Sequence, residues 1–147
     1  IRLTDTTIEL IGQHLRSLKY LNISHCQLYS NLNPLANCKI LSVLILEKCT
    51  LVKEMNDLLE ELCLTEINVK SCTMLGDTFL KKVLQCSPLR KIGFGGNKIS
   101  RKTVDTFLEN ARIKRPSLSI NCDTLLRGMS TSGLENRIVT HSLRETR

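Results

Sequence analysis

Hydrophobic positions recur along the chain in one nine-residue pattern. The pattern reads apolar-x-x-apolar-x-apolar-x-x-Cys/Asn, and it is clearest in LKYLNISHC (18–26), LSVLILEKC (41–49), LTEINVKSC (64–72) and LRKIGFGGN (89–97). A weaker fifth copy, RPSLSINCD, occupies 115–123, so the copies begin 23, 23, 25 and 26 residues apart. Because the inner apolar-x-apolar pair alternates at period two, each copy predicts a short strand with one buried face.

Amphipathic helical patterns fill the stretches between these strands. The segments 4–15, 51–62, 77–86 and 100–113 carry apolar residues on one face, and Ser100 stands where the last of them needs an N-cap. We expect a short helix or an irregular turn in 27–38, which contains Pro34. In the last three helical segments the predicted buried residues are Leu51, Met55, Leu58, Leu59 and Leu62; Phe79, Leu80, Val83, Leu84 and Cys86; and Val104, Phe107, Leu108, Ala111 and Ile113.

A strand, a turn and a helix form a unit that cannot bury its own apolar face, so such units stack against one another. The pattern therefore predicts an α/β solenoid with short parallel strands on its concave face and helices on its convex face. We assign residues 1–123 to this solenoid. Residues 124–147 break the pattern, and we expect them to form a C-terminal cap or a partly disordered basic tail.

The ninth position of the pattern is where the chain turns from strand toward helix. Cys26, Cys49, Cys72 and Asn97 occupy it, and Asp123 occupies it in the weak fifth copy. Backbone groups in such a turn lack ladder partners. An Asn side chain or a small buried thiol can hydrogen-bond to them. We therefore interpret these residues as structural rather than as redox or metal-binding groups.

These residues make the chain resemble leucine-rich-repeat proteins over roughly residues 4–123. The resemblance implies about five repeats. The Cys at the ninth position, with further Cys at 38, 63 and 86, is similar to the cysteine-containing repeats of F-box and leucine-rich-repeat proteins. In that family the repeats capture substrates for ubiquitin ligases, which implies the same role here. No F-box is present in these residues, and GGNKIS after the fourth strand resembles instead the Asn-type repeats of ribonuclease inhibitor and nucleotide-sensing receptors.

The outward strand positions alternate with the buried ones, and stacked together they predict one binding surface. Tyr20, Val43 and Ile45 form an apolar spot on this surface, beside a mixed-charge stripe of Glu47, Glu66, Lys70 and Lys91. An apolar anchor ringed by charge is typical of a protein-binding hot spot. The alternative is that Val43 and Ile45 are ordinary strand formers. The full predicted set is Tyr20, Asn22, Val43, Ile45, Glu47, Glu66, Asn68, Lys70, Lys91, Gly93 and Gly95.

The stretch IGFGGNKIS (92–100) invites comparison with a phosphate-binding loop. A P-loop requires Gly-Lys-Ser/Thr, whereas Lys98 follows Asn97 and precedes Ile99. A dinucleotide-binding turn requires a third glycine at position 98, which is lysine. The repeat instead makes Gly93 and Gly95 outward positions, where we expect a bare patch that a partner's backbone can approach.

Charge distribution suggests a second class of function. The net charge is +7, and residues 89–147 hold twelve Lys and Arg against five Asp and Glu, whereas residues 1–88 hold nine of each. Nucleic acid or an acidic partner could bind this basic part, although only three Phe and two Tyr are available for base stacking. The basic residues concerned are Arg90, Lys91, Lys98, Arg101, Lys102, Arg112, Lys114 and Arg115.

The remaining composition favours a non-catalytic protein inside the cell. Seven cysteines without a CxxC motif fit reduced thiols better than a disulfide framework, which indicates the cytoplasm or nucleus. We find no catalytic motif, and we expect no cofactor, no metal, no small-molecule ligand and no membrane span. A zinc site built on His25 and Cys26 is the weaker alternative. The sequence thus predicts an adaptor that binds a protein partner.

Overall fold

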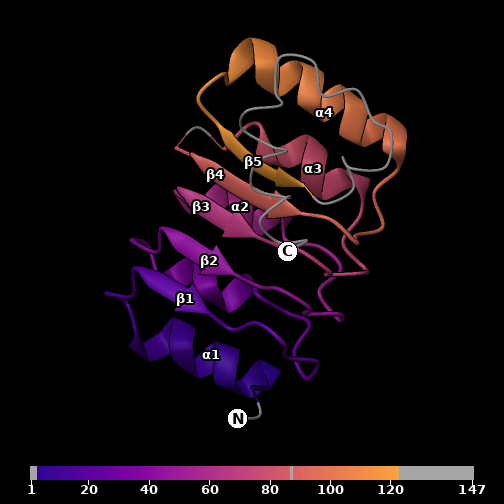
Figure 1. Ribbon diagram of the computed structural model, residues 1–147. Helices are drawn as coiled ribbons and strands as arrows, with labels where there is room; N and C mark the ends of the chain where they lie inside the picture. The colour runs from indigo at the N-terminus through magenta and orange to yellow at the C-terminus, as the bar shows by residue number, and fades with distance from the viewer. Residues whose placement is uncertain (1–2, 87, 123–147) are drawn as a thin grey trace, which may run out of the picture.

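The computed structural model describes residues 3–86 and 88–122, in which helices and short strands alternate (Figure 1). The strands contain three or four residues each. In chain order the elements are α1 (Asp5–His14), β1 (Tyr20–Asn22), the 3-10 helix η1 (Asn33–Asn37), β2 (Val43–Ile45), α2 (Asn56–Glu61), β3 (Glu66–Asn68), α3 (Asp77–Val83), β4 (Lys91–Phe94), α4 (Arg101–Lys114) and β5 (Ser119–Cys122).

The five strands form one parallel sheet in the order β1-β2-β3-β4-β5, which confirms the prediction of an α/β fold with parallel strands. Its register follows the sequence repeat. Leu44 pairs with Ile67, Ile67 with Ile92, and Ile92 with Ile120. All four of these side chains are fully buried, whereas Leu21, the corresponding residue of the edge strand β1, is only partly buried.

The fifth strand lies two residues later in the chain than the sequence repeat predicts. Ser119, not Ser117, pairs with Lys91, and Cys122 pairs with Phe94. The reason is the length of α4, whose 14 residues use more chain than the shorter helices before it. Because the shift is two residues, the alternation of inward and outward side chains is preserved. The predicted turn residue of this copy, Asp123, lies outside the described residues.

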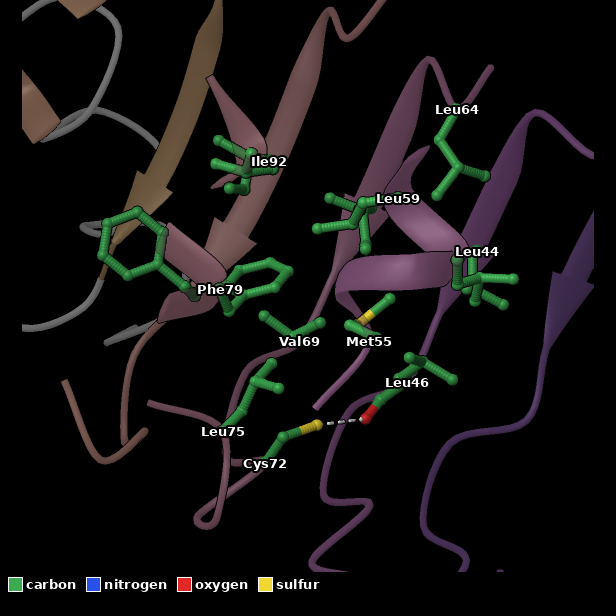
Figure 2. Packing of buried hydrophobic residues seen from close by; sticks show 14 of the residues in the cluster. Leu44, Leu46, Met55, Leu59, Leu64, Val69, Cys72, Leu75, Phe79 and Ile92 are labelled. Atoms are coloured by element: carbon green, nitrogen blue, oxygen red, sulfur yellow. Dashed lines mark hydrogen bonds between the residues drawn. The ribbon is translucent and has the colours of Figure 1, made fainter. Parts of the chain in front are cut away.

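The helical segments lie side by side in the same order as the strands and cover one face of the sheet (Figure 1). Side chains from helices and strands meet in a single apolar core, where Met55, Leu59 and Phe79 lie near Leu44 and Ile92 (Figure 2). At the C-terminal end of this core, Phe94 of β4 and Phe107 of α4 make an edge-to-face contact with centroids 5.5 Å apart. Each unit therefore buries its apolar face against its neighbours.

Helix boundaries agree with the sequence pattern in part. Ser100 is the N-cap of α4, as predicted, because its hydroxyl oxygen accepts a hydrogen bond from the Thr103 amide at 3.3 Å. α2 begins only at Asn56, because the chain first makes turns in which the Val52 amide donates to the Cys49 carbonyl. Leu51 is consequently exposed, which corrects its prediction as a buried helix residue. Ile113 is also wrongly predicted, since it lies on the outer side of α4 and is 64% exposed.

Two aspartates at helix starts tie neighbouring units together. The Oδ1 atom of Asp5 accepts the backbone amides of Ser30 and Asn31, each at 2.9 Å. Asp77, at the start of α3, is bonded in the same way to the start of α4, since its Oδ1 accepts the Ser100 amide at 2.7 Å. These backbone hydrogen bonds lower the pKa of both carboxyl groups. The charged forms are therefore the ones that hold the units together.

The eighth position of the repeat has a backbone conformation that the sequence pattern did not reveal. His25, Lys48 and Ser71 have φ values of 62°, 61° and 60°, and Gly96 follows with 68°. This left-handed conformation reverses the chain at the end of each strand. Three side-chain-bearing residues adopt it, so no glycine signal marks the turn in the sequence.

The ninth-position side chains all point inward and hydrogen-bond to backbone. The thiol of Cys49 donates to the Ile23 carbonyl at 3.3 Å, and that of Cys72 donates to the Leu46 carbonyl at 2.9 Å (Figure 2). Asn97 forms three hydrogen bonds. Its amide nitrogen donates to Val69 and Cys72 carbonyls, and its oxygen accepts from Gly95. Cys26 donates to the Leu3 carbonyl at 2.9 Å.

Tyr29 is a buried polar residue that the periodicity did not single out. Its hydroxyl donates to the Ile23 carbonyl at 2.8 Å and lies 2.6 Å from the Cys49 sulfur. Burial is the main cause that raises the pKa of this phenol far above its usual value. The residue therefore joins the first two turns as a neutral hydrogen-bonding group. No feature of the nine-residue pattern could have indicated it.

Candidate protein-binding surface

The sheet face opposite the helices brings the predicted binding residues together in rows. Across β1 to β4 the first row is Tyr20, Val43, Glu66 and Lys91, and the second is Asn22, Ile45, Asn68 and Gly93. Glu47 comes two residues after Ile45, on the same side of the strand. We call the exposed or half-buried members of this set the open sheet face: Tyr20, Asn22, Val43, Ile45, Glu47, Glu66, Asn68 and Lys91.

The apolar part of the open sheet face lies on its first two strands. Tyr20 is 58% exposed. Val43, its partner across the register, and Ile45 are half-buried. Neighbouring strands are about 4.8 Å apart, so these three side chains form one continuous apolar spot. Val43 connects Tyr20 to Ile45, and Ile45 lies where the spot meets polar residues, because Asn22 and Asn68 flank it across the register.

The polar residues around Ile45 are already held in place by hydrogen bonds. Asn68 donates its side-chain amide to Oε1 of Glu47 at 2.8 Å. On the other side, the Ser24 hydroxyl donates to Oδ1 of Asn22 at 2.7 Å and accepts the Glu47 amide at 3.0 Å. Side chains fixed in this way lose little conformational entropy when a partner binds.

Glu66 and Lys91 form the charged part of the surface. The Lys91 ammonium lies 3.8 Å from Oε2 of Glu66, and the two side chains are 50% and 31% exposed. An exposed pair at this distance contributes roughly 0–1 kcal/mol to stability. Both groups can therefore exchange their mutual contact for contacts with a partner.

Three residues predicted for the surface are buried instead. Lys70 is only 7% exposed. Gly93 is covered by the Asn68 side chain, since a Cβ added there would lie 3.1 Å from Cγ of Asn68. Gly95 is in the turn, with φ of 142° and its amide bonded to Asn97 at 2.8 Å. The predicted bare glycine patch is therefore wrong, because the neighbouring amide and the turn occupy that space.

Several members of the predicted basic set have structural partners. Arg115 donates to the carbonyls of Leu84, Cys86 and Leu89, at 3.2, 3.2 and 2.5 Å. Arg112 forms an ion pair with Glu109 one turn earlier on α4. These contacts engage part of the positive charge within the fold itself. The basic residues are in this respect less available to nucleic acid than their number in the sequence indicates.

The cysteine thiols show no arrangement typical of a redox or metal-binding site. Six of the seven are buried, and Cys63 is exposed. Burial is the main cause that raises the pKa of the Cys72 thiol to about 12, so this group stays protonated at neutral pH. In the described part of the chain, no three His, Cys, Asp or Glu residues gather to hold a metal ion. Its helices also include none with the length and apolarity needed to cross a bilayer.

Comparisons with protein-family models, with curated proteins and with solved structures find no match for this chain.

Proposed function

We propose that the chain is a leucine-rich-repeat solenoid of about five repeats that binds a protein partner through the open sheet face and catalyses no reaction. The observation that carries this proposal is the position of Ile45. Its apolar side chain is partly exposed two residues after Val43, which pairs with Tyr20, and polar groups already held by hydrogen bonds flank it on the neighbouring strands. An apolar anchor within a fixed polar rim is the usual anatomy of a protein-binding hot spot.

Three recurring features support the repeat assignment. The strands pair at offsets that follow the sequence repeat, as in Tyr20 with Val43 and Val43 with Glu66. The eighth residue is left-handed in four successive copies. The ninth residue then donates a side-chain hydrogen bond to the preceding unit, as Cys72 does to Leu46. Such nearest-neighbour contacts are what hold a solenoid together.

The cysteine usage supports a role inside the cell, and the likeness of the repeats to those of F-box proteins supports substrate recognition for a ubiquitin ligase. Seven unpaired thiols are typical of a reducing compartment. In this proposal the open sheet face contacts the substrate. Ligase subunits recovered with the chain would favour this role, and their absence would leave a general adaptor.

The experiment is affinity capture of the tagged chain followed by mass spectrometry, with two matched variants. Ile45→Asp places a charge in the apolar spot, whereas Ile113→Asp makes the same change on the exposed side of α4. We expect partners that co-purify with the wild type and with Ile113→Asp to be lost with Ile45→Asp. Circular dichroism checks that both variants are folded. Equal recovery with both variants would contradict the proposal.

A further inference from the structure

A groove lies on the helical side of the molecule, between α3 and α4. We propose that this groove binds an acidic peptide segment of a partner protein, which inserts an apolar side chain and presents carboxylates to two lysines. The groove encloses about 450 Å³, within the range of ligand pockets, and its lining includes Asp77, Lys81, Leu84, Lys102, Phe107 and Asn110. It is separate from the open sheet face and does not depend on the function proposed for that face.

Ion pairs join neighbouring helical segments elsewhere in the molecule, but none joins the two described helices that form this groove. Lys39 pairs with Glu61 at 3.4 Å and joins the turn after η1 to α2, and Lys82 pairs with Glu60 and joins α3 to α2. Within residues 3–86 and 88–122, no ion pair joins α3 to α4. Lys81 of α3 and Lys102 of α4 instead both line the groove between them. The acidic residue that completes the earlier pairs has no counterpart at this position.

The one acidic side chain in the lining is engaged elsewhere. Oδ1 of Asp77 accepts the Ser100 amide at 2.7 Å, and Oδ2 accepts the Ser100 hydroxyl at 3.1 Å. The Ser100 amide and, to a smaller extent, the charge of Lys81 lower the pKa of Asp77, so this carboxylate mainly serves the start of α4. The lining holds two ammonium groups against this single carboxylate. Added carboxylates are thus favoured over added cations, because they supply the missing opposite charge between the two helices.

The base of the groove is apolar and rigid. Leu84 is half-buried in its lining. Phe107 is fixed from below by its edge-to-face contact with Phe94, with ring centroids 5.5 Å apart. The Asn110 amide and the exposed Thr106 hydroxyl stand on the α4 wall, where they can bond to peptide backbone. Leu84 is thus the apolar side chain that a partner residue contacts, the almost fully buried Phe107 keeps the base rigid, and the polar and cationic walls suit acidic neighbours of that residue.

The surroundings favour a peptide over nucleic acid. Lys98, just before α4, and Lys114, at its end, are exposed and extend the positive field that attracts an acidic segment. The aromatic ring in the lining, Phe107, is 3% exposed. It therefore cannot offer its face to an unstacked base, which is the interaction that single-stranded nucleic acid requires.

The direct test follows amide chemical shifts of the ¹⁵N-labelled full chain during peptide titration. The probe is a short acetylated and amidated peptide in which Leu-Phe is flanked on both sides by Glu-Asp-Glu. We expect saturable shifts in α3 and α4 below about 1 mM peptide. A peptide with Lys in place of each acidic residue, and one with Ser-Gly in place of Leu-Phe, should give none. No saturable shift with the acidic peptide, or equal shifts with the basic one, would overturn the proposal.

Charge-reversal variants locate the site. Lys81→Glu/Lys102→Glu should weaken acidic-peptide binding about tenfold or more, because both cationic walls become repulsive. The matched control, Lys19→Glu/Lys53→Glu, makes the same change in net charge at exposed lysines outside the groove and should bind within about twofold of the wild type. Equal weakening in both double variants would show unspecific attraction to the overall charge and reject the groove. One further result would overturn the proposal of a peptide. In that result a single-stranded oligonucleotide binds to the wild type but not to Lys81→Glu/Lys102→Glu.

Discussion

The turns in the N-terminal part of the sheet differ from the turn after β4 in how they satisfy the same backbone groups. At Cys72 one thiol donates one hydrogen bond to the preceding unit, the Leu46 carbonyl, at 2.9 Å (Figure 2). At Asn97 one amide side chain makes three, to the Val69 carbonyl, the Cys72 carbonyl and the Gly95 amide, at 2.8, 2.9 and 2.8 Å. Both solutions serve the same position of the repeat.

The difference shows what each residue type requires of its neighbours. A thiol is small and apolar enough to be fully buried, as Cys49 and Cys72 are. Asn97 is larger and more polar, and it stays half-buried while it bonds to its own turn. Gly95, with φ of 142°, provides the backbone amide that this second solution uses, whereas the left-handed conformation of Gly96 also occurs at Ser71 in a Cys-type turn. Gly95 is thus part of the Asn-type turn.

The largest effect is expected from Asn97→Ala. The variant removes three hydrogen bonds at about 1 kcal/mol each, so the free energy of unfolding should fall by about 3 kcal/mol. Urea denaturation followed by circular dichroism measures this change. Asn97→Cys restores a single donor and should lose less. If Asn97→Ala were no more damaging than Cys72→Ala, the two turns would be energetically equivalent and the comparison would fail.

A smaller loss is expected from Cys72→Ala. It removes one thiol hydrogen bond and leaves a small cavity at a fully buried position, which should cost about 2 kcal/mol. The same denaturation experiment applies, with Cys63→Ala as the control at the exposed cysteine. Loss of equal size in the control would indicate a general effect of cysteine removal.

Substitutions at the eighth position of the repeat test how the left-handed backbone conformation contributes to stability. Gly96→Ala places a side chain at φ of 68° and should destabilise the fold by about 1 kcal/mol. Ser71→Gly relieves the same strain at φ of 60° and should stabilise it by a similar amount. The shift in the midpoint of thermal unfolding checks both. Changes of the same sign in the two variants would contradict the conformational explanation.

The smallest effects concern the aspartates that join neighbouring units. Hydrogen bonds lower the pKa of Asp5 and Asp77 in the folded state. Their contribution is therefore present above the unfolded-state pKa of about 3.9 and is lost as pH falls through the folded-state value. Urea midpoints between about pH 5 and pH 3 should fall less steeply for Asp77→Asn than for the wild type. An unchanged pH dependence would remove this role.

The sequence predicted those parts of the fold that depend on periodic apolar positions. Leu44, Ile67 and Ile92 were placed correctly because their burial follows from alternation alone. The left-handed residues were missed because His25, Lys48 and Ser71 carry no signature of that conformation. Burial of Lys70 and Gly93 was missed because it depends on neighbouring units in space, such as Asn68 over Gly93. The α3–α4 groove arises from packing between units and has no local pattern.

The most direct measurement is a calorimetric titration of a partner recovered by affinity capture against the purified chain. Ile45→Asp should abolish the binding heat, because a desolvated carboxylate would replace the apolar anchor of the open sheet face. Ile113→Asp should bind as the wild type does, since Ile113 lies on the outer side of α4. Unchanged affinity of Ile45→Asp would contradict the account, because the open sheet face would then not be the binding surface.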